Sequence, residues 1–225
     1  MSRIVDALAS LPDRDRPPEG VREVWLPVPG APLYAVSNYG RILSLPRPHK
    51  PGVHRGFEAS ICADLGGSDG SQPRMFARSD VGPKGSAVPR VVLHVFDRPA
   101  EEAERVLLGE GDLVMGRVCY LDNIEWSHDR RARGLRAVLG YVIDGATSKE
   151  ACAASGIHSA TLYSVLIPWA EDRGLRLGIG VKPDTGRRGI DQKWATQVWN
   201  MCGSILAGSN RRQGEALARA TPWPA

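Results

Sequence analysis

The hydrophobic pattern of the chain changes near residue 130, and this change constrains the fold more than any other feature. Upstream, apolar and polar residues alternate over short segments that end at turn-forming residues, as in "YAVSNYGRILSL" at 34–45. Alternation with a period of two is typical of strands joined by tight turns. Downstream, apolar residues recur every three or four positions, which predicts helices. The predicted helices cover 130–144, 148–154, 158–172, 190–206 and 209–219.

We therefore expect an α+β protein, in which a small β-rich module precedes an all-helical part. Residues 1–20 are predicted to form a short helix and a linker, because Pro and charged residues follow the first apolar segment. Residues 21–130 form the β-rich module. The helical part divides into 131–180 and 181–225.

Several segments of the β-rich module have less regular patterns. The apolar run "VPRVVLHVF" at 88–96 fits a strand or a buried helix equally well. Residues 99–108 are predicted to form one or two helical turns, with Pro99 in the first turn. Weak strands are expected around Glu58–Leu65 and Arg74–Ser79, within a stretch rich in Pro, Gly and Ser.

The distribution of charge indicates the kind of partner. Residues 1–126 contain 15 Lys and Arg against 17 Asp and Glu, whereas residues 127–225 contain 14 against 8. The net charges are thus −2 and +6. A basic second half favours an anionic partner such as nucleic acid.

Other features of the composition exclude several classes of protein. There is no run of about 18 apolar residues, so no membrane helix is expected. The N-terminal segment lacks the apolar stretch of a signal peptide, which favours a cytoplasmic location without membrane contact. The four cysteines form no CxxC pair, so we expect buried free thiols rather than a zinc site.

Three segments resemble phage HNH homing endonucleases. Trp25, Pro27 and the stretch 34–45 resemble the small DNA-binding motif at the front of these enzymes. Downstream, "VPRVVLHVFDRP" at 88–99 and "LDNIEWSHDRR" at 121–131 resemble two segments of the HNH nuclease core. The resemblance implies that the first motif contacts DNA. The residues assigned to this contact are Ser37, Asn38, Tyr39 and Arg41.

The same resemblance implies that the catalytic residues are missing. In HNH enzymes a histidine deprotonates the attacking water, while an acid and a helix asparagine hold a divalent metal. Counting back from Asn123 places this histidine at Gly111, or at Leu108 if three residues are inserted, and the asparagine falls on Ala132. We therefore predict a degenerate core with no catalytic residue, no bound metal and no cofactor. His94 and His128 are the nearest histidines that a rebuilt site would use.

The span 135–175 has the pattern of a helix-turn-helix. Gly145 ends one predicted helix, Thr147 or Ser148 caps the next, and Gly156 lies at the sharp turn. The apolar side chains predicted to pack the last helix against the first are Ile157, Leu162, Val165 and Leu166. Pro168 falls within that helix, where it is expected to kink or end it.

The outward positions near the start of that helix are predicted to enter the major groove of DNA. These residues are His158, Ser159, Tyr163 and Ser164. In the basic segment "KPDTGRRG" at 182–189, Arg187 and Arg188 are predicted to contact phosphates. In the C-terminal stretch, Ser209 is expected to cap a separate last helix that exposes Arg211, Arg212 and Arg219.

The sequence thus predicts a sequence-specific protein that binds double-stranded DNA, derived from an HNH nuclease but catalytically inactive, and acting as a phage or prophage-type transcriptional regulator. Two alternatives remain open. One is an active, divergent HNH homing endonuclease. The other is a protein-interaction factor that acts on RNA polymerase or on a phage packaging enzyme. Whether the protein forms a homodimer also stays open.

Overall fold

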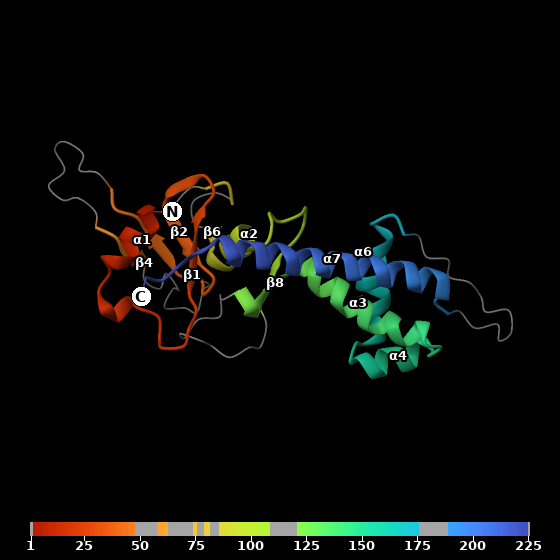
Figure 1. Ribbon diagram of the computed structural model, residues 1–225. Helices are drawn as coiled ribbons and strands as arrows, with labels where there is room; N and C mark the ends of the chain where they lie inside the picture. Colours follow the sequence, from red (N-terminus) through yellow and green to blue (C-terminus); the bar gives the residue numbers. More distant parts are fainter. Residues whose placement is uncertain are drawn as a thin grey trace. The chain divides into compact units, whose positions relative to one another are not determined.

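The computed structural model of the 225-residue chain describes residues 2–47, 58–62, 74–75, 79–81, 86–108, 121–175 and 189–224. The chain divides into two compact units (Figure 1). The first unit comprises Met1–Trp126 together with Arg211–Ala225, and the second comprises Ser127–Asn210. Among the described residues, the first unit contains the antiparallel sheets and the second contains helices and their connecting turns, so the predicted α+β class is confirmed.

A five-stranded antiparallel sheet forms the centre of the first unit. Its strands follow the order β4-β3-β2-β1-β9. Strand β1 (Val24–Val28) pairs with β2 (Ala31–Ser37), which pairs with β3 (Ile42–Ser44). Strand β4 (Ser60–Cys62) extends one edge, and β9 (Thr221–Pro222), from the end of the chain, pairs with β1 at the other.

Both faces of this sheet are buried, which explains why the alternation in β1 is incomplete. On one face, Val24 and Val28 pack with helix α2 (Val88–Phe96). On the other, the fully buried Trp25 packs with Leu8 of helix α1 (Ser2–Ala9). A strand covered on both faces is apolar at successive positions. The short helix predicted within residues 1–20 is confirmed as α1.

The apolar run at 88–96 is the buried helix α2, with Pro89 in its first turn, where a missing N–H costs no hydrogen bond. Two short antiparallel pairs accompany the main sheet. Strand β5 (Arg74–Met75) pairs with β6 (Ser86–Ala87). Strand β7 (Val106–Leu108) pairs with β8 (Ile124–Trp126). The short 3-10 helices η1 (Asp13–Asp15) and η3 (Leu121–Asn123) complete the described part of this unit.

The prediction of helical turns at 99–108 is wrong. The buried carboxylate of Glu104 accepts bonds from the Arg98 guanidinium at 2.6 and 2.8 Å and from the Glu101 N–H at 2.7 Å. These bonds close an irregular loop in which Ala103 has a positive φ of 58°. Residues 106–108 then extend as β7. A buried charge pair therefore overrides the local helix preference of this segment.

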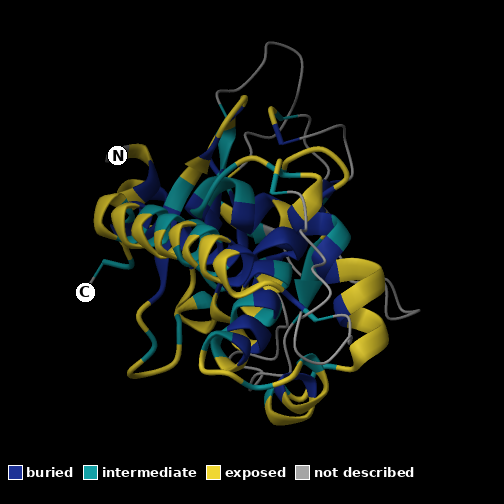
Figure 2. Cartoon of the chain, turned by 90° about the vertical axis from the view of Figure 1, so that its right-hand side faces the viewer, coloured by how far each residue is buried: buried dark blue, intermediate teal, exposed yellow. Residues whose placement is uncertain are grey.

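The second unit packs its helices around one apolar core. Helix α3 (Ser127–Ile143) is followed by α4 (Ser148–Ser155). A continuous helical run then comprises α5 (Ser159–Thr161), the π-helix η4 (Leu162–Leu166) and α6 (Ile167–Glu171). Core residues include Leu135 and Leu139 of α3, Leu162 of η4 and Trp194 of α7 (Gln192–Arg219). The helices carry buried residues on one side and exposed residues on the other (Figure 2).

Pro168 neither ends nor breaks the helical run. The π-helix precedes it, and the N–H of Ile167 bonds to the carbonyl of Leu162, five residues back. The wider turn accommodates the proline, which has no N–H to donate. Leu162 and Leu166 are buried as predicted, but Val165 is 39% exposed, so its predicted core role is wrong. The extra residue in the π turn changes which side chains face the core.

The two C-terminal helices predicted at 190–206 and 209–219 form the single helix α7. Ser209 is buried inside this helix rather than at a cap, because the helix continues through the small residues around it. The first part of α7 contributes Val198 and Cys202 to the core of the second unit, and its last part contributes Ala216 to the core of the first unit.

Two cysteines of the second unit confirm the expectation of buried free thiols. Cys152 and Cys202 are both buried and unpaired with each other. Burial raises the pKa of Cys202 to about 11 and also raises that of Cys152. Among the residues that the structure describes, no helix combines the length and apolar character needed to cross a bilayer.

Candidate nucleic-acid interface

The turn between β2 and β3 contains the four residues that the motif assigns to DNA contact. The hydroxyl of Ser37, which is fully buried, accepts hydrogen bonds from the N–H groups of Tyr39 at 3.2 Å and Arg41 at 3.0 Å. Gly40 has a φ of 75°, a conformation that glycine adopts without strain. Ser37 therefore stabilises the turn from inside.

Asn38 connects this turn to two other segments. Its Oδ1 accepts a bond from the N–H of Val24 at 2.9 Å, and its Nδ2 donates to the carbonyl of Arg22 at 3.3 Å. Its own carbonyl accepts a bond from the N–H of Leu121 at 2.6 Å. The turn is thereby attached to β1 and to the segment 121–126.

Arg41 is the most strongly bonded residue of the turn. Its Nε donates to Oε1 of Glu23 at 2.8 Å, and its Nη2 donates to Oε2 of the same carboxylate. Its Nη1 donates to the carbonyl of Asp15 at 2.7 Å. The guanidinium also lies 5.6 Å from the ring centre of Trp25 and 5.3 Å from that of Trp223. Because the residue is only 5% exposed, almost none of it is accessible to DNA.

Tyr39 and Asn38 are the two turn residues that keep partial exposure. Beyond the turn, the guanidinium of Arg47 lies 5.5 Å from the ring centre of Tyr34 and bonds its hydroxyl. The structure thus brings the four predicted residues together but directs Ser37 and Arg41 inward. Of the four predicted residues, only Asn38 and Tyr39 are therefore still expected to contact DNA.

The second candidate region follows α4. Thr147 caps α4 in a full capping box, since its hydroxyl accepts from the Glu150 N–H at 3.3 Å and Glu150 accepts from the Thr147 N–H at 2.8 Å. These bonds lower the pKa of Glu150. Gly156 ends α4 with a φ of 69°, and Nδ1 of His158 accepts from the Ala160 N–H at 3.2 Å at the start of α5. The predicted caps and turn are confirmed.

His158, Ser159, Tyr163 and Ser164 all lie on the exposed side of the helical run, as predicted. Tyr163 is 48% exposed, while Ser164 donates its hydroxyl to the carbonyl of Ala160 at 2.6 Å. Residues 151–170 contain no Asp, Glu, Lys or Arg, so no carboxylate, ammonium or guanidinium group comes from this part of the chain. Arg187 and Arg188 lie outside the described residues.

The two described positions to which the resemblance assigns nuclease chemistry, Leu108 and Ala132, are apolar. Ala132 is fully buried in the core of the second unit and offers no atom that could bind a metal. Leu108 lies in β7 opposite Ile124 and packs against the core of the first unit. Gly111 lies outside the described residues. Within either unit taken alone, the described chain brings no three His, Cys, Asp or Glu side chains to metal-binding distance of one another.

His128 is placed poorly for base catalysis. It is 8% exposed, and its Nδ1 lies 2.8 Å from Nη2 of Arg173. A guanidinium only donates hydrogen bonds, so Nδ1 accepts and the ring proton is on Nε2. Neither nitrogen then has a lone pair available for a water molecule. His94, on α2, is half-buried, and burial is the main cause that lowers its pKa.

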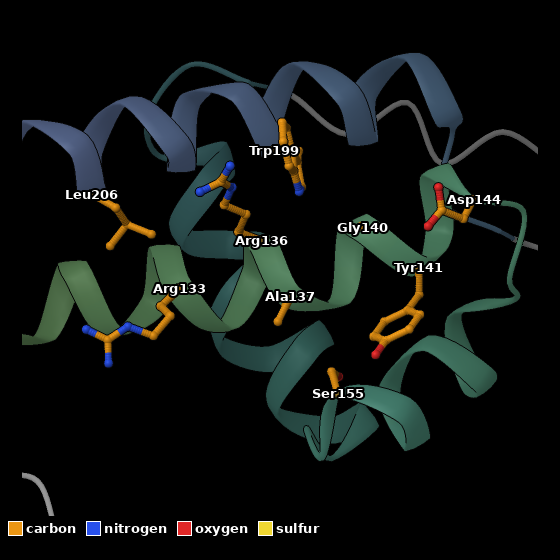
Figure 3. A pocket seen from close by; sticks show the side chains of 9 residues that line it. All are labelled: Arg133, Arg136, Ala137, Gly140, Tyr141, Asp144, Ser155, Trp199 and Leu206. Atoms are coloured by element: carbon orange, nitrogen blue, oxygen red, sulfur yellow. The ribbon is translucent and has the colours of Figure 1, made fainter.

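An open groove of about 500 Å³ lies between α3 and α7 in the second unit (Figure 3). The Arg136 guanidinium stacks 4.2 Å from the ring centre of Trp199 and connects the two helices. Ala137 and Gly140 line the middle of the groove, and the 44% exposed Tyr141 lies on its side towards α4. The groove was not predictable from the sequence, because its residues come from helices about sixty positions apart.

Comparison with known proteins identifies one segment. Residues 23–60 match the NUMOD4 motif, a nuclease-associated modular DNA-binding domain found in HNH endonucleases. No match was found among curated proteins or among solved structures. The predicted resemblance of the first motif is therefore confirmed, and it supports DNA binding by the first unit. The nuclease core and the helix-turn-helix remain predictions.

The bonds of the motif turn predict a large effect of Arg41→Met on stability. Removing one partner of a buried ion pair leaves the other charge unpaired, which costs about 3–5 kcal/mol. Urea denaturation at neutral pH should show this loss in the transition of the first unit. The exposed neighbour provides the control, and Arg22→Met should change stability by less than about 0.5 kcal/mol. Equal effects of the two variants would contradict the structural role of Arg41.

Proposed function

We propose that this protein binds double-stranded DNA sequence-specifically without cutting it, and that it acts as a phage or prophage-type transcriptional regulator. The observation that carries the proposal is the NUMOD4 match at 23–60 in a chain whose metal-ligand position is the buried Ala132. Leu108, at one of the two positions for the catalytic base, is likewise an apolar strand residue. A protein that binds a DNA site without cleaving it is suited to block or recruit other proteins there.

We assign sequence recognition to the helical run that begins at Ser159. In a helix-turn-helix, residues near the start of the second helix contact base edges in the major groove. Tyr163 and the hydroxyls of Ser159 and Thr161 are exposed on this helix and offer donors and acceptors. No acidic side chain lies between Glu150 and Glu171, so none on this helix face repels the phosphates.

The net positive charge of the second half of the chain also favours DNA binding. Arg187 and Arg188 belong to a basic stretch that we assign to phosphate contacts, which add affinity without sequence preference. Two DNA-binding units in one chain raise each other's effective concentration on a site that both can reach. Modest affinity in each unit is then sufficient for tight binding.

Self-association is a second element of the proposal. Arg133, Ala137 and Gly140 of α3 and Asp144, the first residue after it, are spaced four, three and four residues apart, so they follow one stripe along the groove. If a second copy packs its α3 antiparallel on this stripe, each Arg133 faces Asp144 of the other copy and Ala137 faces Gly140. The small central residues let the helices approach, and the stripe is self-complementary in charge. A two-fold dimer would match a palindromic DNA site.

The rival functions depend on particular residues. A divergent nuclease would need His94 or His128 as its base, and Arg173 already bonds His128. A protein-interaction factor is favoured by the exposed Tyr163 and Val165, since exposed apolar side chains that lie together mark protein contacts. The experiments below separate these possibilities.

The first experiment measures binding and cleavage on the same DNA. The protein should retard genomic fragments in gel shifts, and its binding should weaken steeply with salt. It should not nick supercoiled plasmid when Mg²⁺ or Mn²⁺ is added at stoichiometric protein. Nicking that disappears in His94→Ala or His128→Ala would instead identify an active nuclease. Absence of salt-dependent DNA binding, with a stable protein partner, would favour the interaction factor.

Replacing Tyr163 and Ser164 with Ala should relax sequence preference. The variant loses the Tyr163 side chain that we assign to base edges and the neighbouring Ser164 hydroxyl, so binding to the preferred site should fall by about tenfold to a hundredfold. Binding to random DNA should stay constant, because phosphate contacts are retained. Val165→Ala, an exposed neighbour, is the matched control. An unchanged ratio of specific to random binding would contradict the placement of the recognition helix.

Exchanging the charges of Arg133 and Asp144 tests the proposed dimer. Asp144→Arg and Arg133→Asp should each weaken self-association, because like charges then face each other across the two-fold axis. The double variant Arg133→Asp/Asp144→Arg should restore it, and a mixture of the two single variants should form a heterodimer. Sedimentation equilibrium measures the mass of the wild type, the two single variants, the double variant and the mixture. Identical masses for the wild type and both single variants would contradict pairing through this stripe.

A further inference from the structure

A hollow of about 570 Å³ opens on the first unit, apart from the motif turn. It is lined by residues of α1, β1, β2, α2 and the end of α7, segments that lie far apart in the sequence. Three prolines, Pro27, Pro29 and Pro32, contribute to its wall together with aliphatic side chains. Its shape and position were not evident from the sequence.

All of the ionisable residues that line this hollow are basic. They are Arg3, His94 and Arg219, and no Asp or Glu is among the lining residues. Arg3 and Arg219 are exposed, so each guanidinium is accessible to a ligand. His94 is half-buried at the same site, and burial, which outweighs the opposing effect of Asp80, lowers its pKa. At neutral pH its ring is therefore uncharged and still offers one N–H donor.

The motif turn itself leaves little for a ligand to contact. Ser37 and Arg41 are buried, and their polar groups are bonded within the chain. A DNA-binding unit needs cationic groups at its surface, because phosphate contacts supply most of the nonspecific affinity. In the first unit, the hollow combines two exposed guanidinium groups with a rigid apolar wall.

We propose that this hollow holds a segment of the DNA backbone, with Arg3 and Arg219 on phosphates, His94 as a hydrogen-bond donor and the prolines against deoxyribose. The inference rests on the proposed DNA binding and adds the surface that the first unit uses. Arginine pairs well with phosphate because its planar group donates two parallel bonds. Proline rings offer apolar contact at no cost in side-chain entropy.

The test compares arginines of equal charge in the same unit. Arg3→Gln and Arg219→Gln should each reduce the slope of log K against log salt by about 0.9, the value for one lost phosphate contact. The double variant should bind about tenfold or more weakly, to preferred and random DNA alike, because phosphates carry no sequence information. Arg14→Gln and Arg211→Gln, both at exposed positions outside the hollow, should leave the slope unchanged.

A second pair of variants adds charge instead of removing it. Pro32→Glu places a carboxylate at the hollow and should weaken binding more than Pro18→Glu in the exposed linker. Thermal unfolding of every variant checks that the fold is retained.

The outcomes separate the two proposals. Suppose that the double variant Arg3→Gln/Arg219→Gln keeps both the wild-type slope of log K against log salt and specific binding. This result would contradict DNA binding at the hollow but not the proposed function. Equal losses of DNA affinity in Arg14→Gln and Arg211→Gln, or a changed ratio of specific to random binding, would also contradict DNA binding at the hollow. A wild-type chain without salt-dependent binding overturns both.

Discussion

The buried ion pair between Glu23 and Arg41 is the interaction on which the first unit depends. Its atoms connect η1, β1 and the β2–β3 turn, and its guanidinium lies beside two tryptophans from opposite ends of the chain. Desolvating two charges is costly, so such a pair is favourable only where further bonds satisfy both groups. Here the Asp15 carbonyl accepts a further bond from the Arg41 guanidinium, and the rings of Trp25 and Trp223 lie close to it. The pair therefore fixes the relative position of segments that are otherwise joined only by short strands.

This arrangement changes what the family match implies. The NUMOD4 match at 23–60 supports DNA binding by the unit, yet Ser37, Asn38 and Arg41 use most of their hydrogen-bonding groups inside the chain. The polar residues that make the motif recognisable thus belong largely to the folding of the turn. The basic residues expected to contact phosphates, Arg3, His94 and Arg219, then lie outside the matched segment, although prolines within it line the same hollow. A motif of this kind locates a DNA-binding unit more reliably than it locates the contacting atoms.

Much of the secondary structure was predictable because it depends on local chemistry. The capping box at Thr147 and Glu150 and the left-handed Gly156 are short-range features, and both appear as expected. The wrong expectations concern features that the spacing of apolar residues does not indicate. Glu104 closes a loop with Arg98 where helix was predicted, and the π turn before Pro168 exposes Val165. Ser209 is buried inside a continuous helix because both ends of α7 have a core to pack against.

The two candidate sites also differ in whether the sequence pattern could indicate them. The exposure of His158, Ser159, Tyr163 and Ser164 follows from helical periodicity, which the sequence contains. The hollow at Arg3, His94 and Arg219 depends on five elements that only the folded sheet brings together, so no spacing in the sequence indicates it. The two surfaces also differ in charge. The helix from 159 is uncharged and suited to base edges, whereas the hollow is cationic and suited to phosphates. If both contact one DNA site, salt should govern the affinity contributed by the first unit, while sequence should govern that of the second.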